Sequence, residues 1–482
     1  MELPKKTIPG SYGTPFFGSI ADRIDYFYKQ GADLFFKTRM EKYGSTVFRS
    51  NIGPGPFISK DSRVIVLLDA VSFPILFDTS KVEKRDVLTG TYLPSVSFTG
   101  GYRMLAYLDP SEPRHKLFKR YFLSLLASKH SEFVPLFRSS MSRLFTELED
   151  GLSCDNNGKQ KGGVPFSDLN EKMSLNFLYN LFFDGLGPEG SVLRTDWAPK
   201  FFDLWLFFQL SPLMTLGLPK FLNPLEDLIL HTFRLPPFLL RSEYKKFYMA
   251  VNDASASVLD EMEKLGISRD EACHNLIFLM VFNAFGGMKT AFPVLLKWVG
   301  TAGKDLHHRL ADEIRGIVEA EGGLTLASLE KMRLTKSVVY EALRIEPPVQ
   351  FQYGHAKEDM VIRSHDAAYE IKKGEMILGY QPFATRDPRV FKKAEEFVGD
   401  RFMGEEGERL LKYVYWSNGR EVDNPTPGDK QCPGKNLVMT MCRVMLAEFF
   451  LRYDTFEVDV GVLPTGASVT FKSLTKTSRS HN

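Results

Sequence analysis

The chain has 482 residues, of which 61 are Lys or Arg and 59 are Asp or Glu, so its formal net charge is +2. This balance argues against a nucleic-acid partner, because such partners bind through concentrated neutralisation of phosphate charge. Hydrophobic residues form 44% of the chain and charged residues 25%. These are ordinary globular proportions, which exclude disorder, collagen and coiled coil as global descriptions. No linker, internal repeat or low-complexity tract is visible, and we expect a single domain over residues 1–482.

Cysteine usage and the apolar segments bear on the compartment. Four cysteines in a chain of this length, Cys154, Cys273, Cys432 and Cys442, are too scattered for a disulfide scaffold and indicate a reducing compartment. The first nine residues have neither the apolar core of a signal peptide nor an Arg/Ser-rich transit stretch. The most apolar segment, 201–222, is interrupted by polar residues and prolines and predicts a buried or interfacial stretch, not a spanning helix. We therefore expect a cytoplasmic protein, or one peripherally associated with membranes or lipid bodies.

The predicted elements are mainly helical with small β-sheets. Short β segments are expected at 45–52 and 63–68, where β-branched residues alternate between Gly/Pro turns. The polar run 155–163 predicts a surface loop. Apolar residues at helical spacing predict a helix over 304–321. Alternation over 359–379 predicts a hairpin, and the segments 456–460 and 468–474 predict a further small sheet at the C-terminal end.

Cys432 occupies a position where a thiolate can be stabilised. It follows a Pro/Gly-rich loop and comes just before a strongly apolar helical stretch, 437–450. Amides at a helix N-terminus favour a thiolate and lower the pKa of a cysteine. A thiolate held in this way suits a haem iron. Taken alone, the motif is weak evidence, and an ordinary half-buried cysteine is the better explanation of it.

The order of several motifs strengthens the interpretation of Cys432. Glu341 and Arg344 share one face of a predicted helix that ends before Pro347, but an exposed ion pair has the same spacing. After them come the predicted hairpin, then Arg401 in the segment 397–402, and then Cys432. This ordered series resembles the haem-thiolate fold of the cytochrome P-450 superfamily. The resemblance implies that Glu341, Arg344 and Arg401 form a buried ion-pair triad, and that Cys432 is the axial ligand of a haem b iron.

The sequence departs from the superfamily pattern at two places, and these departures indicate which branch of the superfamily it resembles. An insertion, 420–431, separates Trp416-Ser-Asn-Gly419 from Cys432. The long central helix carries Asn283 in place of the acid-Thr pair that would relay protons during dioxygen activation. Both departures resemble the plant branch that metabolises fatty-acid hydroperoxides: allene oxide synthases, hydroperoxide lyases and divinyl ether synthases. The similarity runs nearly end to end and includes residues 8–13, 46–49, 72–77, 107–113, 380–385 and 415–419.

The resemblance implies a cofactor, a substrate and roles for particular residues. The substrate would be a polyunsaturated fatty-acid hydroperoxide, which already contains its O–O bond, so neither a reductase nor NADPH is needed. Asn283 would hydrogen-bond the hydroperoxide, since an amide can both donate and accept; a buried Asn that caps a kink at Gly286-Gly287 is the alternative. Lys289 would meet the fatty-acid carboxylate or a haem propionate, unless it is an exposed lysine. Four further residues match positions that contact haem propionates: Lys84, His115, Lys119 and Lys430.

Two residues, Leu88 and Ala284, indicate which product the enzyme would form from the hydroperoxide. Allene oxide synthases commonly carry Phe at the position that matches Leu88, because the face of a ring can favour an electron-poor intermediate. Leu88 and Ala284 look more like the lyases, so we expect a hydroperoxide lyase, closest to the subgroup that cleaves 9- and 13-hydroperoxides of linoleic and linolenic acid into an aldehyde and an oxo-acid. Allene oxide synthase is the alternative, with epoxyalcohol or divinyl ether formation behind it. Two alternative functions belong to other classes of protein: an NADPH-dependent monooxygenase and a non-catalytic haem- or lipid-binding protein.

Overall fold

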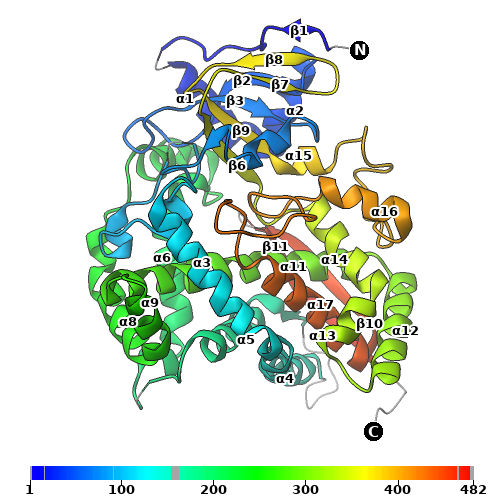
Figure 1. The fold of residues 1–482 in the computed structure, drawn as a ribbon. Helices are drawn as coiled ribbons and strands as arrows, with labels where there is room; N and C mark the ends of the chain where they lie inside the picture. Colours follow the sequence, from blue (N-terminus) through cyan, green and yellow to red (C-terminus); the bar gives the residue numbers. More distant parts are fainter. Residues whose placement is uncertain are drawn as a thin grey trace.

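The computed structural model describes residues 3–15, 17–90, 92–153, 162–187, 189–463 and 466–477. Cys154 and most of the predicted loop at 155–163 lie outside the described residues. Figure 1 shows most of the strands gathered at one end of the molecule together with a few helices, and most of the helices at the other end, where the C-terminal strands lie among them. The described residues are mainly helical with small sheets, as the sequence predicts.

The helical part contains one large hydrophobic core. Its helices are α3 (Pro113–Ser128), α4 (Phe133–Leu152), α5 (Phe166–Phe182), α6 (Trp197–Leu210), α8 (Arg241–Ala254), α9 (Ala256–Lys264), α10 (Arg269–Ile277), α11 (Gly286–Thr301), α12 (Lys304–Glu321), α13 (Leu326–Lys331), α14 (Arg333–Ile345) and α17 (Lys435–Arg452). The other α-helices among the described residues are α1 (Phe17–Ile24), α2 (Gly31–Tyr43), α7 (Asn223–Glu226), α15 (Gln381–Thr385) and α16 (Gly404–Leu410). The helix predicted at 304–321 is confirmed.

Three small sheets accompany the helices. The five-stranded sheet has the order β2 (Val47–Asn51), β3 (Arg63–Leu67), β9 (Met376–Tyr380), β6 (Phe351–Ala356) and β4 (Val82–Glu83). A second sheet joins β1 (Lys5–Lys6), β8 (Ala368–Ile371) and β7 (Met360–Arg363). The third joins β10 (Tyr453–Leu463), β11 (Gly466–Lys476) and β5 (Val164–Pro165). The strands predicted at 45–52 and 63–68 pair antiparallel, and the predicted C-terminal sheet is confirmed.

The hairpin predicted over 359–379 is only partly correct. β7 and β8 do pair antiparallel, with Met360 opposite Ile371. The following strand, β9, leaves them and pairs with β3 and β6 in the five-stranded sheet. All five residues of β9 are buried. A strand that is apolar on both faces belongs in the interior of a sheet, and alternation alone does not reveal which sheet it joins.

The central helix is continuous from Arg269 to Thr301 and comprises α10, the π-helical segment η11 (Phe278–Phe285) and α11. By length and composition it could cross a membrane, but 56% of its most apolar window is buried inside the molecule. It packs against α5, α14 and α17, so it is a core helix. The apolar segment 201–222 is broken, since α6 ends at Leu210 and two short 3-10 turns follow.

Candidate functional site

The loop before α17 surrounds the sulfur of Cys432 with hydrogen-bond donors. Cys432 lies three residues before the start of α17 at Lys435. Its own backbone N–H donates to the carbonyl of Ser417 at 3.1 Å, which ties the cysteine to the Trp416–Gly419 turn. Burial raises the pKa of the Cys432 thiol, while the Gly434 N–H, the nearby Lys119 ammonium and the Trp416 side chain act to lower it. Three groups that favour a thiolate therefore converge on a sulfur that is otherwise shielded from water.

The insertion 420–431 is packed against the rest of the loop. The Gln431 side chain donates to the carbonyl of Arg420 at 2.8 Å, and Lys435 donates to the carbonyl of Asp423 at 2.7 Å. At Gly419, a Cβ atom would lie 2.5 Å from the Gln431 side chain, so any larger residue would have to displace that side chain. The insertion thus fixes the approach of the chain to Cys432.

A cluster of buried basic groups lies beside the cysteine loop. Four residues match propionate positions and influence one another electrostatically: Lys84, His115 and Lys119, which are buried, and Lys430, which is half-buried. Burial, together with the neighbouring Lys430, lowers the pKa of Lys84 to about 7. Burial and the Lys119 charge likewise lower the pKa of Lys430 to about 7. Burial, Lys430 and Lys119 lower the pKa of His115 to about 3.

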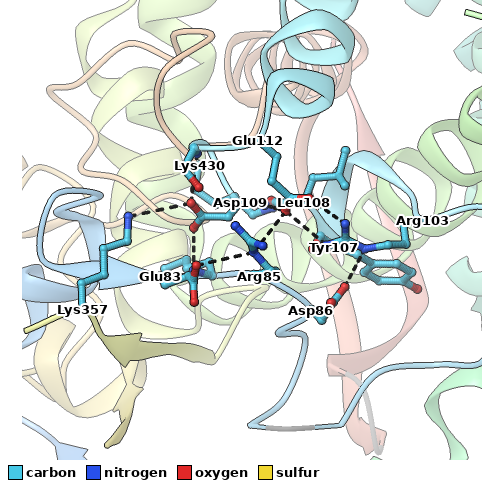
Figure 2. Close-up of polar contacts among 12 residues, drawn as sticks. Glu83, Arg85, Asp86, Arg103, Tyr107, Leu108, Asp109, Glu112, Lys357 and Lys430 are labelled. Atoms are coloured by element: carbon cyan, nitrogen blue, oxygen red, sulfur yellow. Dashed lines mark hydrogen bonds and ion pairs between the residues drawn. The ribbon is translucent and has the colours of Figure 1, made fainter. Parts of the chain in front are cut away.

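Each of the three lysines has polar partners within the protein. Lys430 donates to the carbonyls of Leu105, Ala106 and Leu108, and Figure 2 shows it beside Leu108 and Asp109. Lys119 donates to Asp429, and Lys84 donates to Asn418. By contrast, the Nδ1 atom of His115 and the Nε2 atom of Gln352 are buried without a partner among the described residues.

This cluster fits the propionates of a haem whose iron would be held by Cys432. Its two nearest carboxylates are already engaged, since Asp109 accepts from the Lys84 backbone N–H at 2.7 Å and Asp429 accepts from Lys119 at 2.8 Å. An additional pair of carboxylates would favour the charged forms of the lysines and would offer acceptors to the unpartnered nitrogens. The donor set and the cysteine therefore match a haem-thiolate cofactor.

An ion-pair network near this cluster was missed by the sequence reasoning. Arg103 donates to Glu112 at 2.6 Å and to Asp86 at 2.8 Å, which Figure 2 shows as a clamp between the segment carrying Asp86 and the start of α3. Asp86 has a φ of 52°, a turn geometry that the clamp holds. The detectable signal was the spacing Asp109-Pro-Ser-Glu112 before Pro113, an acidic capping pattern at a helix start. The clamp fixes the segment that continues to Leu88.

The predicted ion-pair triad is assembled at the end of α14. Arg344 donates to both carboxylate oxygens of Glu341, at 2.7 and 2.9 Å, and Arg401 donates to the same carboxylate at 2.9 Å. Glu341 and Arg344 are fully buried. The remaining guanidinium donors bind backbone carbonyls, including those of Thr385 and Glu396. A buried charge cluster of this kind is tolerable because its donors are satisfied.

The three remaining candidate residues come from two segments: Asn283 and Lys289 lie on the central helix, and Leu88 follows β4. Asn283 lies in η11 and is exposed, although most of the neighbouring positions on the central helix are buried; its amide makes no hydrogen bond to another described residue. Leu88 is half-buried after β4. Lys289 contacts Glu171 at 2.7 Å and Asp203 at 2.5 Å, so the protein itself supplies its carboxylate partners. The exposed-lysine alternative does not describe Lys289, and its contact with a substrate carboxylate stays a prediction.

The fold and the cysteine site are those of a haem-thiolate protein, and comparison with known sequences identifies the class. The family model "Cytochrome P450" matches residues 301–473. The chain belongs to the cytochrome P450 family, in the branch that contains the plant allene oxide synthases. It is 54% identical to allene oxide synthase 1, chloroplastic, of Solanum lycopersicum, over 99% of this chain and 88% of the relative. It is 54% identical to allene oxide synthase 2 of Oryza sativa subsp. japonica, over 97% of this chain and 96% of the relative. Allene oxide synthase, chloroplastic, of Arabidopsis thaliana is 50% identical, over 99% of this chain and 90% of the relative.

These comparisons correct the expected location. The cytoplasmic or peripherally membrane-associated assignment is wrong, because relatives that match nearly the whole chain are named chloroplastic. That assignment depended on the composition of the first nine residues, which is no guide to the compartment. The comparisons also do not support the lyase subgroup, since the relatives are named as allene oxide synthases.

Proposed function

We propose that this protein is an allene oxide synthase, which removes water from a polyunsaturated fatty-acid hydroperoxide to form an allene oxide. The observation that carries the proposal is the similarity, at 50–54% identity over nearly the whole chain, to relatives named as allene oxide synthases. The reaction is balanced without an external oxidant or reductant, because one hydroperoxide yields one epoxide and one water. The enzyme therefore needs no dioxygen, NADPH or reductase.

The residues of the chain take distinct parts in this proposal. When bound, the haem supplies the iron that splits the O–O bond homolytically. Cys432 provides the thiolate ligand, and the basic cluster holds the two propionates. The accessible amide of Asn283 donates to one oxygen of the hydroperoxide and accepts from the other, which orients the O–O bond. No carboxylate occurs between Phe282 and Lys289, so this helix supplies no acid to protonate a bound dioxygen.

Hydroperoxide lyase is a second candidate, and Leu88 favours it. After O–O cleavage the substrate radical has two fates. Oxidation of the carbon radical and loss of a proton give the allene oxide, whereas return of the hydroxyl gives a hemiacetal that fragments into an aldehyde and an oxo-acid. A ring face near the radical would stabilise positive charge, as a cation is stabilised over an aromatic ring. Leu88 has no such face.

Product analysis tests both candidates. The haem-loaded protein is incubated with the 9- and 13-hydroperoxides of linoleic and linolenic acid, without NADPH and under anaerobic conditions. We expect full-rate consumption and ketols, the hydrolysis products of an allene oxide. If the products were mainly aldehydes and oxo-acids, the protein would be a hydroperoxide lyase and not an allene oxide synthase. A requirement for dioxygen or NADPH would overturn both and favour a monooxygenase, and no turnover at all would favour a non-catalytic binding protein.

A further inference from the structure

A row of aromatic side chains connects the neighbourhood of the basic cluster with the surface. The indole of Trp205 on α6 is buried, and its ring lies 6.0 Å from the ring of Tyr244 on α8, nearly parallel to it. On its other side Trp205 contacts Phe278, with 6.2 Å between the ring centroids, and Phe278 contacts Tyr107 at 5.3 Å. The indole N–H donates to the carbonyl of Phe98 at 3.2 Å, which fixes the ring.

The inner end of this row adjoins residues that we assign to the haem and the hydroperoxide. Tyr107 lies in a 3-10 turn whose carbonyls accept from Lys430. Phe278 also stacks on Phe282, with the ring centroids 4.4 Å apart, and Phe282 immediately precedes Asn283 on the central helix. The row therefore begins beside a residue of the basic cluster and beside the proposed substrate amide.

Each phenol at the outer end of the row has a proton acceptor. The carboxylate of Asp270 lies 3.6 Å from Nε2 of His274, which favours a proton on that nitrogen and leaves Nδ1 as an acceptor. The hydroxyl of Tyr244 donates to this Nδ1 atom at 2.7 Å. Tyr248 and Tyr102 donate to the two oxygens of Asp270, at 2.8 and 2.9 Å. The Asp270 side chain is 54% exposed, so this hydrogen-bonded network reaches the solvent.

The position of the acceptors determines where a radical in this row would come to rest. Indole and phenol lose one electron more readily than other side chains, and an oxidised phenol must pass its proton to a base within hydrogen-bond reach. The hydroxyl of Tyr107 is buried without a partner among the described residues, whereas that of Tyr244 is bound to His274. Oxidation of the row therefore ends at Tyr244.

We propose that Trp205 and Tyr244 form an electron relay that restores the haem iron when a substrate radical escapes before the reaction is complete. The inference rests on O–O homolysis at the iron, the first step of the proposed function. Homolysis takes one electron from the iron, which the substrate radical normally returns when it is oxidised. If the radical escapes, one electron and one proton are needed to restore ferric iron and to release the remaining hydroxyl as water.

The relay supplies that electron from the outer end of the row. Tyr244 gives up one electron through Trp205, its phenolic proton passes to Nδ1 of His274, and a neutral tyrosyl radical is left. The proton that completes the water comes from the solvent. The negative charge of Asp270 stabilises the protonated His274. Tyr244 is half-buried, so a soluble one-electron donor such as ascorbate reduces the radical, and His274 returns the proton.

Electron paramagnetic resonance tests the relay. The haem-loaded protein is mixed with tert-butyl hydroperoxide and frozen within milliseconds; this hydroperoxide has no double bond, so its radical cannot form an epoxide and return the electron. We expect a tyrosyl signal in the wild type and its loss in Tyr244→Phe, which keeps the ring. Tyr453→Phe is the matched control and should keep the signal, because Tyr453 donates to Glu149 at 2.8 Å but its ring contacts phenylalanines, Phe145 and Phe449.

Two outcomes would overturn the relay: a wild type that binds haem but gives no tyrosyl signal, and a signal in Tyr244→Phe equal to that of the wild type. His274→Gln is a second variant if Tyr244→Phe does not fold. Glutamine accepts a hydrogen bond but does not take the proton, so the signal should be lost, and a signal equal to the wild type would contradict the proposal. The products play no part in these measurements, so failure of the relay would leave the synthase assignment to the ketol analysis.

The number of turnovers before inactivation measures the role of the relay during the reaction. With a fatty-acid hydroperoxide, the initial rates of the wild type and Tyr244→Phe should be equal. Added ascorbate should increase the number of turnovers in the wild type and not in Tyr244→Phe. An equal increase in both proteins would contradict the restoring role of Tyr244.

Discussion

The ammonium of Lys119 donates to both the backbone carbonyl and the carboxylate of Asp429, at 2.8 Å each. This contact links α3 to the loop that carries Cys432, across 310 residues of sequence. The Lys119 side chain is 2% exposed and the Asp429 side chain 29% exposed, so the pair is protected from most of the solvent. The cysteine loop is therefore anchored by a residue from the opposite side of the site.

Breaking this anchor should loosen the cysteine loop. We expect Lys119→Met to reduce the free energy of unfolding by ~1–3 kcal/mol, because the carboxylate of Asp429 loses its charged donor. Chemical denaturation of the haem-free protein measures the change. Asp429→Asn is the matched control, since it keeps an acceptor and removes only the charge. If Lys119 also binds a propionate, Lys119→Met should lower haem affinity more than Asp429→Asn does; equal losses would limit Lys119 to the anchoring role.

Haem binding should change the protonation of Lys84. Burial lowers the pKa of Lys84 from 10.5 to about 7 in the haem-free protein. Between these values the unfolded chain binds more protons than the folded chain, so the stability of the haem-free protein should rise with pH across this window. A propionate beside Lys84 restores the charged form. At pH 8.5, haem binding should therefore take up about one more proton in the wild type than in Lys84→Met.

Indicator-dye titration measures this proton uptake. Lys81→Met is the control, because Lys81 is an exposed lysine that pairs with Glu358. Equal uptake in the wild type and Lys84→Met would remove Lys84 from the propionate site. If the stability of the haem-free wild type did not rise relative to that of haem-free Lys84→Met between pH 7 and 9, the lowered pKa of Lys84 would be contradicted.

Cys432, which is half-buried, and Cys442, which is buried, should behave differently. Cys432→Ser should abolish the thiolate-type absorption spectrum and turnover, because the alcohol is a much weaker ligand. Cys442 lies inside α17, and burial raises the pKa of its thiol to about 12, so it stays protonated. Cys442→Ala should keep the spectrum and cost only ~1 kcal/mol of stability. A thiolate spectrum that survives in Cys432→Ser would end the haem-thiolate assignment of that residue.

The sequence predicted the residues whose roles depend on order along the chain. The order of the motifs along the chain is distinctive, and it identified Glu341, Arg344 and Arg401. Each pair of these residues taken alone is an ordinary ion pair. The partners of Lys289 could not be found in this way. Glu171 and Asp203 lie on α5 and α6, and only tertiary packing brings them to the central helix. The sheet that β9 joins could not be predicted from the sequence either, because it is determined by the burial of both faces of the strand.

The basic cluster shows the same division. Resemblance placed Lys84, Lys119 and Lys430 at the site, but their individual partners are backbone carbonyls, an amide and a carboxylate that no spacing rule identifies. The Arg103 clamp was missed because its arginine lies nine residues before Glu112, outside the range of helical or turn spacing. Local patterns therefore predict elements and caps, whereas ion-pair partners depend on the fold.

Removal of the Asn283 amide should slow the chemical step. We expect Asn283→Ala to lower kcat and kcat/KM together by about tenfold, equal to ~1.4 kcal/mol, because the hydrogen bond strengthens as the O–O bond stretches. Steady-state consumption of the hydroperoxide measures both constants. Asn176→Ala, at an exposed asparagine on α5, is the control and should change neither. A change in KM alone would make Asn283 a binding residue without a part in the chemical step.

The last prediction concerns the branch between allene oxide and aldehyde. If a ring face promotes oxidation of the substrate radical, Leu88→Phe should raise the ratio of ketols to aldehydes while hydroperoxide consumption stays nearly constant. A cation over a ring gains ~0.5–2 kcal/mol, and ~1.4 kcal/mol is tenfold in a rate ratio. The expected change is therefore a shifted mixture and not a complete switch.

The control for this branch is Leu88→Met, which keeps the apolar volume and adds no ring. It should leave the product ratio unchanged. Leu88 lies two residues after Asp86, which accepts a hydrogen bond from Arg103 at 2.8 Å. If Leu88→Phe lowers total turnover at a constant ketol-to-aldehyde ratio, the ring merely crowds the substrate. A wild-type enzyme that already gives only ketols would show that an aromatic residue at position 88 is not needed for the synthase reaction.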